Sequence, residues 1–131
     1  MSMPYKAGVC NIGKTEIRKR YAFGAAGFVL AAIILVWMSV SGFSHTWFAL
    51  LAIPLFAGFE GTYQGALHFC AGFGVTGRYD FLGTRKEYGK VTSQKEHKAD
   101  IMMSLKIHAY SLWSAVLVTI VIISILNAIG L

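Results

Sequence analysis

Three long apolar stretches, separated by short polar segments, constrain the fold of this chain more than any other feature of its sequence. They cover approximately residues 21–43, 47–73 and 107–131. Each is long enough to cross the hydrocarbon core of a bilayer, which takes about 20 helical residues. Only 14% of the 131 residues are charged, whereas about a quarter are charged in a typical soluble domain. We therefore expect an all-α integral membrane protein with three transmembrane helices in a single domain, residues 1–131.

The lysines and arginines indicate how these helices are oriented. Five of the twelve precede the first stretch and seven lie between residues 78 and 106, whereas residues 41–46 and 107–131 contain none. Because positively charged loops stay in the cytoplasm, we expect residues 1–20 and 74–106 inside the cell, and the connection 41–46 and the C-terminus outside. The chain then belongs in the inner (cytoplasmic) membrane, where its basic patches can contact anionic lipid headgroups. The pattern does not indicate nucleic-acid binding, because no basic stripe alternates with aromatic residues on a soluble fold.

The polar segments also predict how the helices are connected. The connection 41–46 is short, so the first two helices should form a hairpin. A hydroxyl at Thr92 or Ser93, followed by Glu96, fits the capping box that begins a helix. That helix can run through Lys106 into the third apolar stretch, so its first third would stand in the cytoplasm. Within the second stretch, Pro54 predicts a kink.

Glu60 is the only acidic residue in the long apolar stretches, and polar residues follow it at regular intervals. Gln64 and His68 lie four and eight positions later, and Tyr63 is adjacent in the sequence. A spacing of four places side chains on one face of a helix. A carboxylate within a bilayer costs at least about 2.5 kcal/mol, so this face should turn towards protein, water or a ligand. Such a face can exchange protons or bind a polar group, and it can also hold helices together.

Glycines lie beside this polar face on the second stretch. Gly58, Gly61 and Gly65 fall on one smooth side of the predicted helix, and Gly61 and Gly65 form a small-xxx-small pair. Small residues at this spacing let the backbones of two membrane helices approach closely. We therefore expect this side to be a helix-packing surface.

Cysteine and histidine residues should gather near the cytoplasmic boundary. Cys10, His68, Cys70 and His108 are predicted at similar depth and could form a tetrahedral zinc site. His68 and His108 alone could ligate a haem between neighbouring helices. Packing without any cofactor is the alternative for all four residues. In the cytoplasm the two cysteines should remain free thiols.

The run from Cys10 to Arg20 contains Asn11, Gly13 and Glu16. This pattern resembles the opening of a family of small two-helix bacterial inner-membrane proteins of unknown function, which start with Asn-Val-Gly and an acidic-Arg motif. The run from Cys70 to Gly77 resembles the cysteine-containing exit of their hairpin, so the resemblance covers about residues 8–77. The chain departs from the family by having Ala71 where the family has proline, and by its third apolar stretch. Some family members are fused to rhodanese domains, which implies thiol or persulfide chemistry at Cys10 or Cys70.

Three functional hypotheses follow from these patterns. The first is a subunit or stabiliser of a membrane complex or homo-oligomer, because a carboxylate in a three-helix protein needs cover from other helices. The second is a small proton or cation carrier or channel that uses the face of Glu60, Gln64 and His68. The third is a haem- or metal-binding redox protein. The sequence contains no nucleotide-binding loop, nucleophile elbow or metalloprotease motif, which favours a role other than catalysis.

Overall fold

The structure is a computed structural model that describes residues 5–81 and 89–131, and the described part is mostly helical. Its elements, in chain order, are α1 (Lys14–Val40), the 3-10 helix η1 (His45–Leu51), α2 (Ala52–Ala66), α3 (Ala71–Thr76), β1 (Arg78–Tyr79), β2 (Gly89–Lys90) and α4 (Gln94–Ile129). Two of the helices, α1 with 27 residues and α4 with 36, are long and apolar enough to cross a membrane. This finding is compatible with a membrane protein by length and composition.

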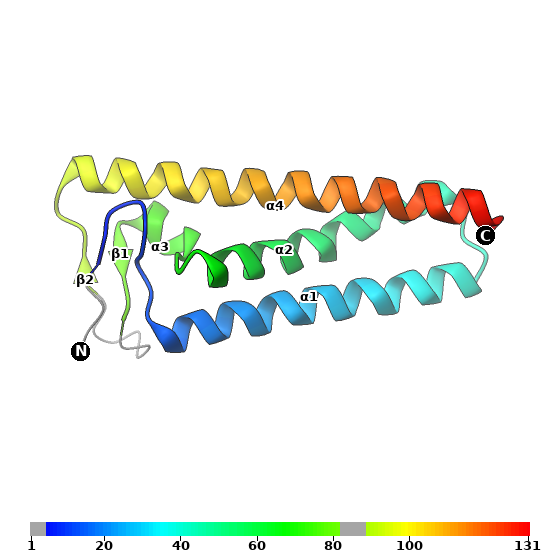
Figure 1. Cartoon of the computed structure of the whole chain (residues 1–131), viewed down its shortest axis with the longest axis horizontal. Coiled ribbons are helices and arrows are strands. Elements are labelled where there is room, and N and C mark those ends of the chain that lie inside the picture. The colour runs from blue at the N-terminus through cyan, green and yellow to red at the C-terminus, as the bar shows by residue number, and fades with distance from the viewer. Residues whose placement is uncertain (1–4, 82–88) are drawn as a thin grey trace.

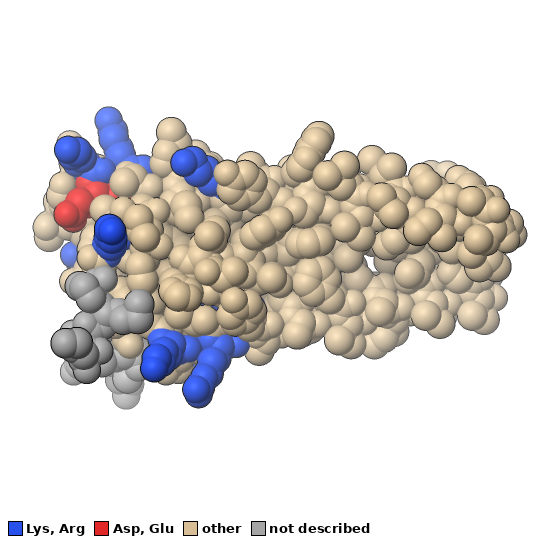
Figure 2. Space-filling model, in the orientation of Figure 1, with Lys and Arg blue, Asp and Glu red and all other residues tan. Residues whose placement is uncertain are grey.

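The three main helices lie side by side in one layer, with α2 in the middle (Figure 1). Helix α2 packs extensively against both α1 and α4. The N-terminal segment, α3, β1 and β2 gather at one end of the layer, and the C-terminus lies at the other. Lys and Arg side chains cluster at the first end, and the remainder of the face seen in Figure 2 is uncharged. The basic residues, which lie in two separate segments of the sequence, therefore come together at one end of the folded molecule.

The second apolar stretch folds differently from the single helix that its composition predicts. It is divided into η1, α2 and α3, and α2 alone has 15 residues. Pro54 lies in the first turn of α2, just after the change from 3-10 helix to α-helix, where a proline's missing N–H is not needed. Helix α2 ends after Ala66 in a Schellman arrangement: Phe69 N–H donates to Gln64 O over 3.0 Å and His68 N–H to Gly65 O over 3.3 Å. His68 takes the left-handed position of this motif, with φ of 54°.

Glycines bring α1 and α2 into backbone contact. A Cβ atom added to Gly27 would lie 2.5 Å from the backbone nitrogen of Gly58, and one added to Gly61 would lie 2.5 Å from that of Gly24. A Cβ on Gly65 would meet the ring of Tyr21 at 3.0 Å. The predicted smooth side of the second stretch therefore faces α1, and its opposite side is left for α4.

Helix α4 buries small and hydroxyl side chains where it packs against α2 and α3. Its buried residues include Ser104, Ser111, Ala115 and Thr119. Each hydroxyl donates to the carbonyl four residues earlier, over 2.7–2.8 Å, so it is satisfied within its own helix. This arrangement removes the cost of burying the hydroxyls while keeping the helices close. An apolar cluster of larger residues fills the opposite end of the layer from the basic residues: Met38, Phe48, Leu51, Leu55 and Leu126.

The basic end is closed by the N-terminal segment and the two short strands. Strands β1 and β2 pair antiparallel, with Arg78 opposite Lys90. Asn11 N–H donates to His68 O over 3.2 Å, and Asn11 O accepts from Asp80 N–H over 2.9 Å. The N-terminal segment thus lies between the end of α2 and β1. Helix α4 begins as predicted, since the Ser93 hydroxyl accepts from Glu96 N–H over 3.4 Å.

Candidate functional site

A buried carboxylate and a histidine meet between α2 and α4. Glu60 Oε1 lies 2.7 Å from Nδ1 of His108, and the Glu60 side chain is 10% exposed whereas that of His108 is 47% exposed. The contact joins Glu60, on the face of α2 that packs against α4, to α4 just beyond its last lysine, Lys106. At 1.5 Å per residue, Glu60 lies about 9 Å from the end of α2 at the basic end of the molecule. This pair is the centre of the candidate site.

Gln64 connects the pair to the chain beyond α2. Its Nε2 donates to Glu60 Oε1 over 2.9 Å, and its Oε1 accepts from Ala71 N–H over 3.2 Å. Glu60 Oε1 therefore has two partners, whereas Glu60 Oε2 is buried without a hydrogen-bond partner in the described part of the chain. Tyr63, on the next turn, shares a 2.7 Å hydrogen bond with Ser114 of α4. The polar side chains of α2 predicted to face inwards are thus brought against α4, with the exception of His68.

His68 does not join this face. It lies beyond the end of α2, in the left-handed conformation described above, and is exposed. The sequence spacing assumed an unbroken helix from Glu60 to His68, and the Schellman turn after Ala66 rotates His68 off the face. His108, which the sequence analysis assigned only to a metal or haem site, occupies the place beside Glu60 that was expected for His68.

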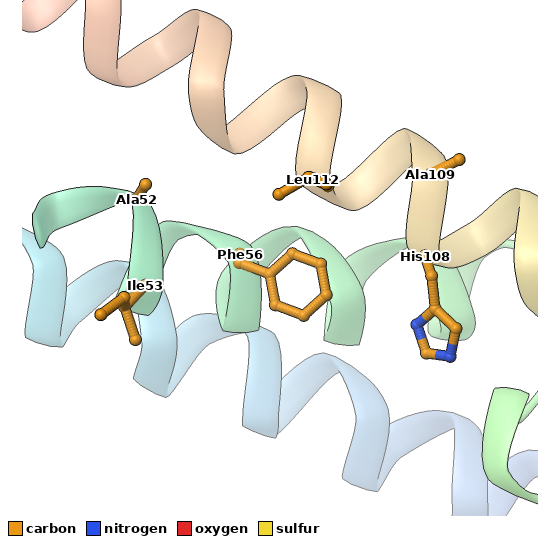
Figure 3. A pocket seen from close by; sticks show the side chains of 6 residues that line it. All are labelled: Ala52, Ile53, Phe56, His108, Ala109 and Leu112. Atoms are coloured by element: carbon orange, nitrogen blue, oxygen red, sulfur yellow. The ribbon is translucent and has the colours of Figure 1, made fainter. Parts of the chain in front are cut away.

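Two cavities share His108. The first, of about 460 Å³, is an apolar crevice between α2 and α4, lined by Ala52, Ile53, Phe56, His108, Ala109 and Leu112. Figure 3 shows the His108 ring extending from α4 at one end of this crevice, with Phe56 and Leu112 further along it. The second, of about 790 Å³, lies at the basic end of the molecule. Polar side chains from five elements line it: Arg20, Gln64, Thr76, Arg78 and His108.

A buried ion pair holds one of these arginines. Arg20 Nη2 donates to Glu16 Oε2 over 3.1 Å, and Lys19 Nζ donates to Glu16 Oε1 over 2.9 Å. The Glu16 side chain is 1% exposed, so its two cationic partners are what allow a carboxylate to be buried there. Arg20 retains an Nε–H without a partner among the described residues. The polar cavity therefore has a cationic wall on the α1 side.

The predicted metal-ligand set is not brought together. Among the residues that the structure describes, no three His, Cys, Asp or Glu side chains gather into a group that could hold a metal ion. Cys10 and Cys70 are both buried and are not joined to each other. Burial raises the pKa of the Cys10 thiol, and its weak hydrogen bond to Ile12 O acts in the opposite direction. Cys70 lines the polar cavity.

The sequence analysis did not identify two buried polar residues at the basic end of the molecule that hold the structure together. Asp100 is fully buried and accepts hydrogen bonds from Tyr5 Oη over 2.5 Å and from Gly8 N–H over 2.7 Å. The sequence analysis placed Asp100 only in the part of the helix that stands in the cytoplasm, and the position of the N-terminal segment reveals its role. Asn11 was noticed only through the family resemblance. Its side-chain amide pairs with the backbone of Cys70.

The chain matches no known protein family, no curated protein and no solved structure. Its function must therefore be inferred from the site itself. That site consists of a buried carboxylate bonded to a half-exposed imidazole, at the point where an apolar crevice meets a cavity with two arginines.

Proposed function

We propose that this chain is a three-span protein of the cytoplasmic membrane that exchanges protons through Glu60 and His108, as a small proton-coupled carrier does. The observation that carries the proposal is the 2.7 Å contact between Glu60 Oε1 and His108 Nδ1. Ionisable side chains within membrane helices are rare and usually mark an ion or proton pathway. The proposal develops the second of the three sequence-based hypotheses, with His108 in place of His68.

The dimensions of the second pass support three spans. Helix η1 and α2 together advance about 36 Å, at about 2.0 Å per residue for the 3-10 helix and 1.5 Å for the α-helix. This length exceeds the thickness of a bilayer's hydrocarbon core, which is about 30 Å. The basic residues at one end support an orientation in which this end, with the N-terminus, is cytoplasmic and the C-terminus is outside.

The orientation can be tested with single cysteines placed at the two ends. Cys10 and Cys70 are buried, so a background carrying both as serine or alanine should leave the ends unchanged. A cysteine at Lys90 should react with a membrane-impermeant maleimide only in inverted vesicles, and one at Ser44 only in intact cells. The opposite pattern would reverse the orientation, and labelling of both from one side would rule out three spans.

The chemistry of the pair suits proton exchange. A carboxylate and an imidazole in contact can share a proton, and an imidazole ordinarily changes charge between about pH 5 and 8. His108 faces the polar cavity, so it can receive a proton there and deliver it to Glu60. Glu60 Oε2, which has no hydrogen-bond partner within residues 5–81 and 89–131, offers a second acceptor within the helix layer. Arg20 and Arg78 are the other charged groups along this cavity.

Proton flux into liposomes tests this function directly. Purified protein is reconstituted with a pH-sensitive dye inside, and the outside is acidified. Glu60→Gln and His108→Gln should each slow the acidification by at least about a hundredfold, the lower end of what a positioned proton-transfer group contributes. His45→Gln, at the opposite end of the layer, is the matched histidine control and should keep the wild-type rate. A rate of acidification that is the same in Glu60→Gln, His108→Gln and wild type would refute the proposal.

A second candidate function is that of a subunit or stabiliser of a membrane complex or homo-oligomer, which was the first hypothesis from the sequence. The arrangement of the helices in a single layer favours it. Large apolar side chains on the outer helices are widely exposed, among them Val36 at 63% and Trp113 at 67%. They can face lipid or a partner helix. Native mass spectrometry after gentle extraction separates the cases, since a partner adds a foreign mass and a homo-oligomer gives a multiple of the chain. Because α4 covers Glu60, the carboxylate itself no longer requires such a partner.

A further inference from the structure

Two cavities of opposite character meet at one side chain, His108. The apolar crevice, of about 460 Å³, extends from His108 along α2 as far as Ala52, away from the basic end. The polar cavity, of about 790 Å³, lies at the basic end. Both volumes fall within the range of about 300–1,000 Å³ that is typical of small-molecule sites. A ligand that occupies both needs a polar head and an apolar tail.

The lining of the polar cavity indicates a negatively charged head. Arg20 from α1 and Arg78 from β1 both line it. Guanidinium groups bind phosphate and carboxylate oxygens with two parallel hydrogen bonds, which makes them the preferred side chains for such anions. The Arg20 side chain is 24% exposed although its Nη2 is bonded to Glu16, whereas its Nε is buried, so an anion would be bound by the exposed part of the guanidinium. The Glu60 carboxylate is already bonded to Gln64 and His108, so its charge is partly compensated.

We propose that this composite site binds one anionic phospholipid of the cytoplasmic leaflet, with the phosphate between Arg20 and Arg78 and one acyl chain in the crevice beyond His108. This inference rests on the proposed three-span orientation, which sets the polar cavity at the surface where anionic headgroups lie. The geometry agrees with that occupant, because the crevice runs from the cavity towards the membrane centre, as an acyl chain runs from its headgroup. The size of the polar cavity favours a phosphate-bearing head over the bare carboxylate of a fatty acid.

Native mass spectrometry of the protein in micelles containing equal amounts of phosphatidylglycerol and phosphatidylcholine tests this inference. The wild-type protein should retain one phosphatidylglycerol. Arg20→Gln and Arg78→Gln should each weaken its binding about tenfold, which corresponds to about 1.4 kcal/mol. Arg18→Gln removes the same charge from the same helix outside the cavity and should leave binding unchanged. Ala109→Phe, which fills the crevice without changing charge, should also release the lipid.

Two further variants keep the test decisive. Arg20→Gln leaves the buried Glu16 with Lys19 alone, so the double variant Glu16→Gln with Arg20→Gln provides the folded comparison if the single variant is unstable. Glu60→Gln should abolish proton flux and still retain the lipid, so the inference and the proposed function can fail separately. Equal loss of lipid in Arg18→Gln and Arg20→Gln, or equal retention of the two lipids, would overturn the inference. Displacement by free phosphate or oleate at micromolar concentration would overturn it as well, by identifying another occupant.

Discussion

The side-chain amide of Asn11 is paired with the backbone of Cys70, 59 positions away, through two hydrogen bonds. Asn11 Nδ2 donates to Cys70 O over 3.0 Å, and Cys70 N–H donates to Asn11 Oδ1 over 2.6 Å. Both residues are buried, so the pair satisfies the Cys70 N–H, which follows the end of α2 and precedes α3, and it adds a second bond to Cys70 O, which already accepts from Gly74 N–H over 2.9 Å. It thereby fixes the chain that runs along one wall of the polar cavity.

Replacing Asn11 with alanine should destabilise the protein by about 1–3 kcal/mol, because it leaves the buried N–H of Cys70 without its partner, whereas Cys70 O keeps its bond from Gly74 N–H. Asn11→Asp keeps the acceptor for Cys70 N–H and loses only the donor to Cys70 O. Chemical unfolding in detergent would measure both. Equal stability of wild type and Asn11→Ala would contradict the role assigned to this pair.

The bond between Tyr5 and Asp100 should make stability depend on pH in the alkaline range. Burial and the hydrogen bond to Asp100 raise the pKa of Tyr5 above its ordinary value, so the folded state holds the phenol proton more tightly than the unfolded state. The resulting stability is fully present below about pH 10, the ordinary pKa of tyrosine, and is lost as the pH rises further. The difference in stability between wild type and Tyr5→Phe should therefore shrink above that pH. A constant difference up to the limit of measurement would refute the linkage.

Gly61 should not tolerate even a methyl group. A Cβ there would lie 2.5 Å from the backbone of Gly24 and from Arg20 O, and backbone atoms cannot move aside as a flexible side chain can. Gly61→Ala should cost about 1–3 kcal/mol, as overpacking of a close interface does. Gly72→Ala is the matched control, because its Cβ would have only Cys70 Sγ nearby, at 3.8 Å. In the same detergent, the midpoint temperature of thermal unfolding should be clearly lower for Gly61→Ala than for wild type and Gly72→Ala.

His68→Gly should leave the protein as stable as wild type or more stable by up to about 1 kcal/mol, since glycine adopts the left-handed conformation without strain but loses more chain entropy on folding. His68→Ala keeps a Cβ in that conformation and should show no gain. Proton flux should be retained in both variants, because His68 is not in contact with Glu60 in the proposed pathway. Loss of proton flux in a variant that still folds would show that His68 takes part in proton transfer.

Cys10 should resist alkylation while the protein is folded. The thiol is buried and its pKa is raised, so the reactive thiolate is scarce and inaccessible. Iodoacetamide at pH 8 should modify Cys10 slowly in the native protein and quickly after denaturation, as mass spectrometry of peptides can show. Rapid modification of Cys10 in native protein would favour the thiol chemistry that the family resemblance implies.

The sequence by itself determined the helical nature of the chain, the grouping of its basic residues, the start of α4 to within Thr92 or Ser93 and the neighbouring glycine and polar faces of α2. These features follow from local patterns, because capping, hydropathy and the period of an α-helix act over a few residues. The adjacent faces of Gly61 and Glu60 on one helix are such a pattern, and only the structure sets Gly61 against α1 and Glu60 against α4.

Only the tertiary structure decided which residues meet across the chain. His108, and not His68, lies beside Glu60 because α2 ends at Ala66. The Schellman turn at this end has His68 in the left-handed position that is usually glycine, so no glycine in the sequence indicates the turn. Asp100 and Asn11 are buried because an N-terminal segment returns to cover the end of the helix layer. These contacts join residues that are about 50 to 100 positions apart, and no local period or propensity specifies such pairings.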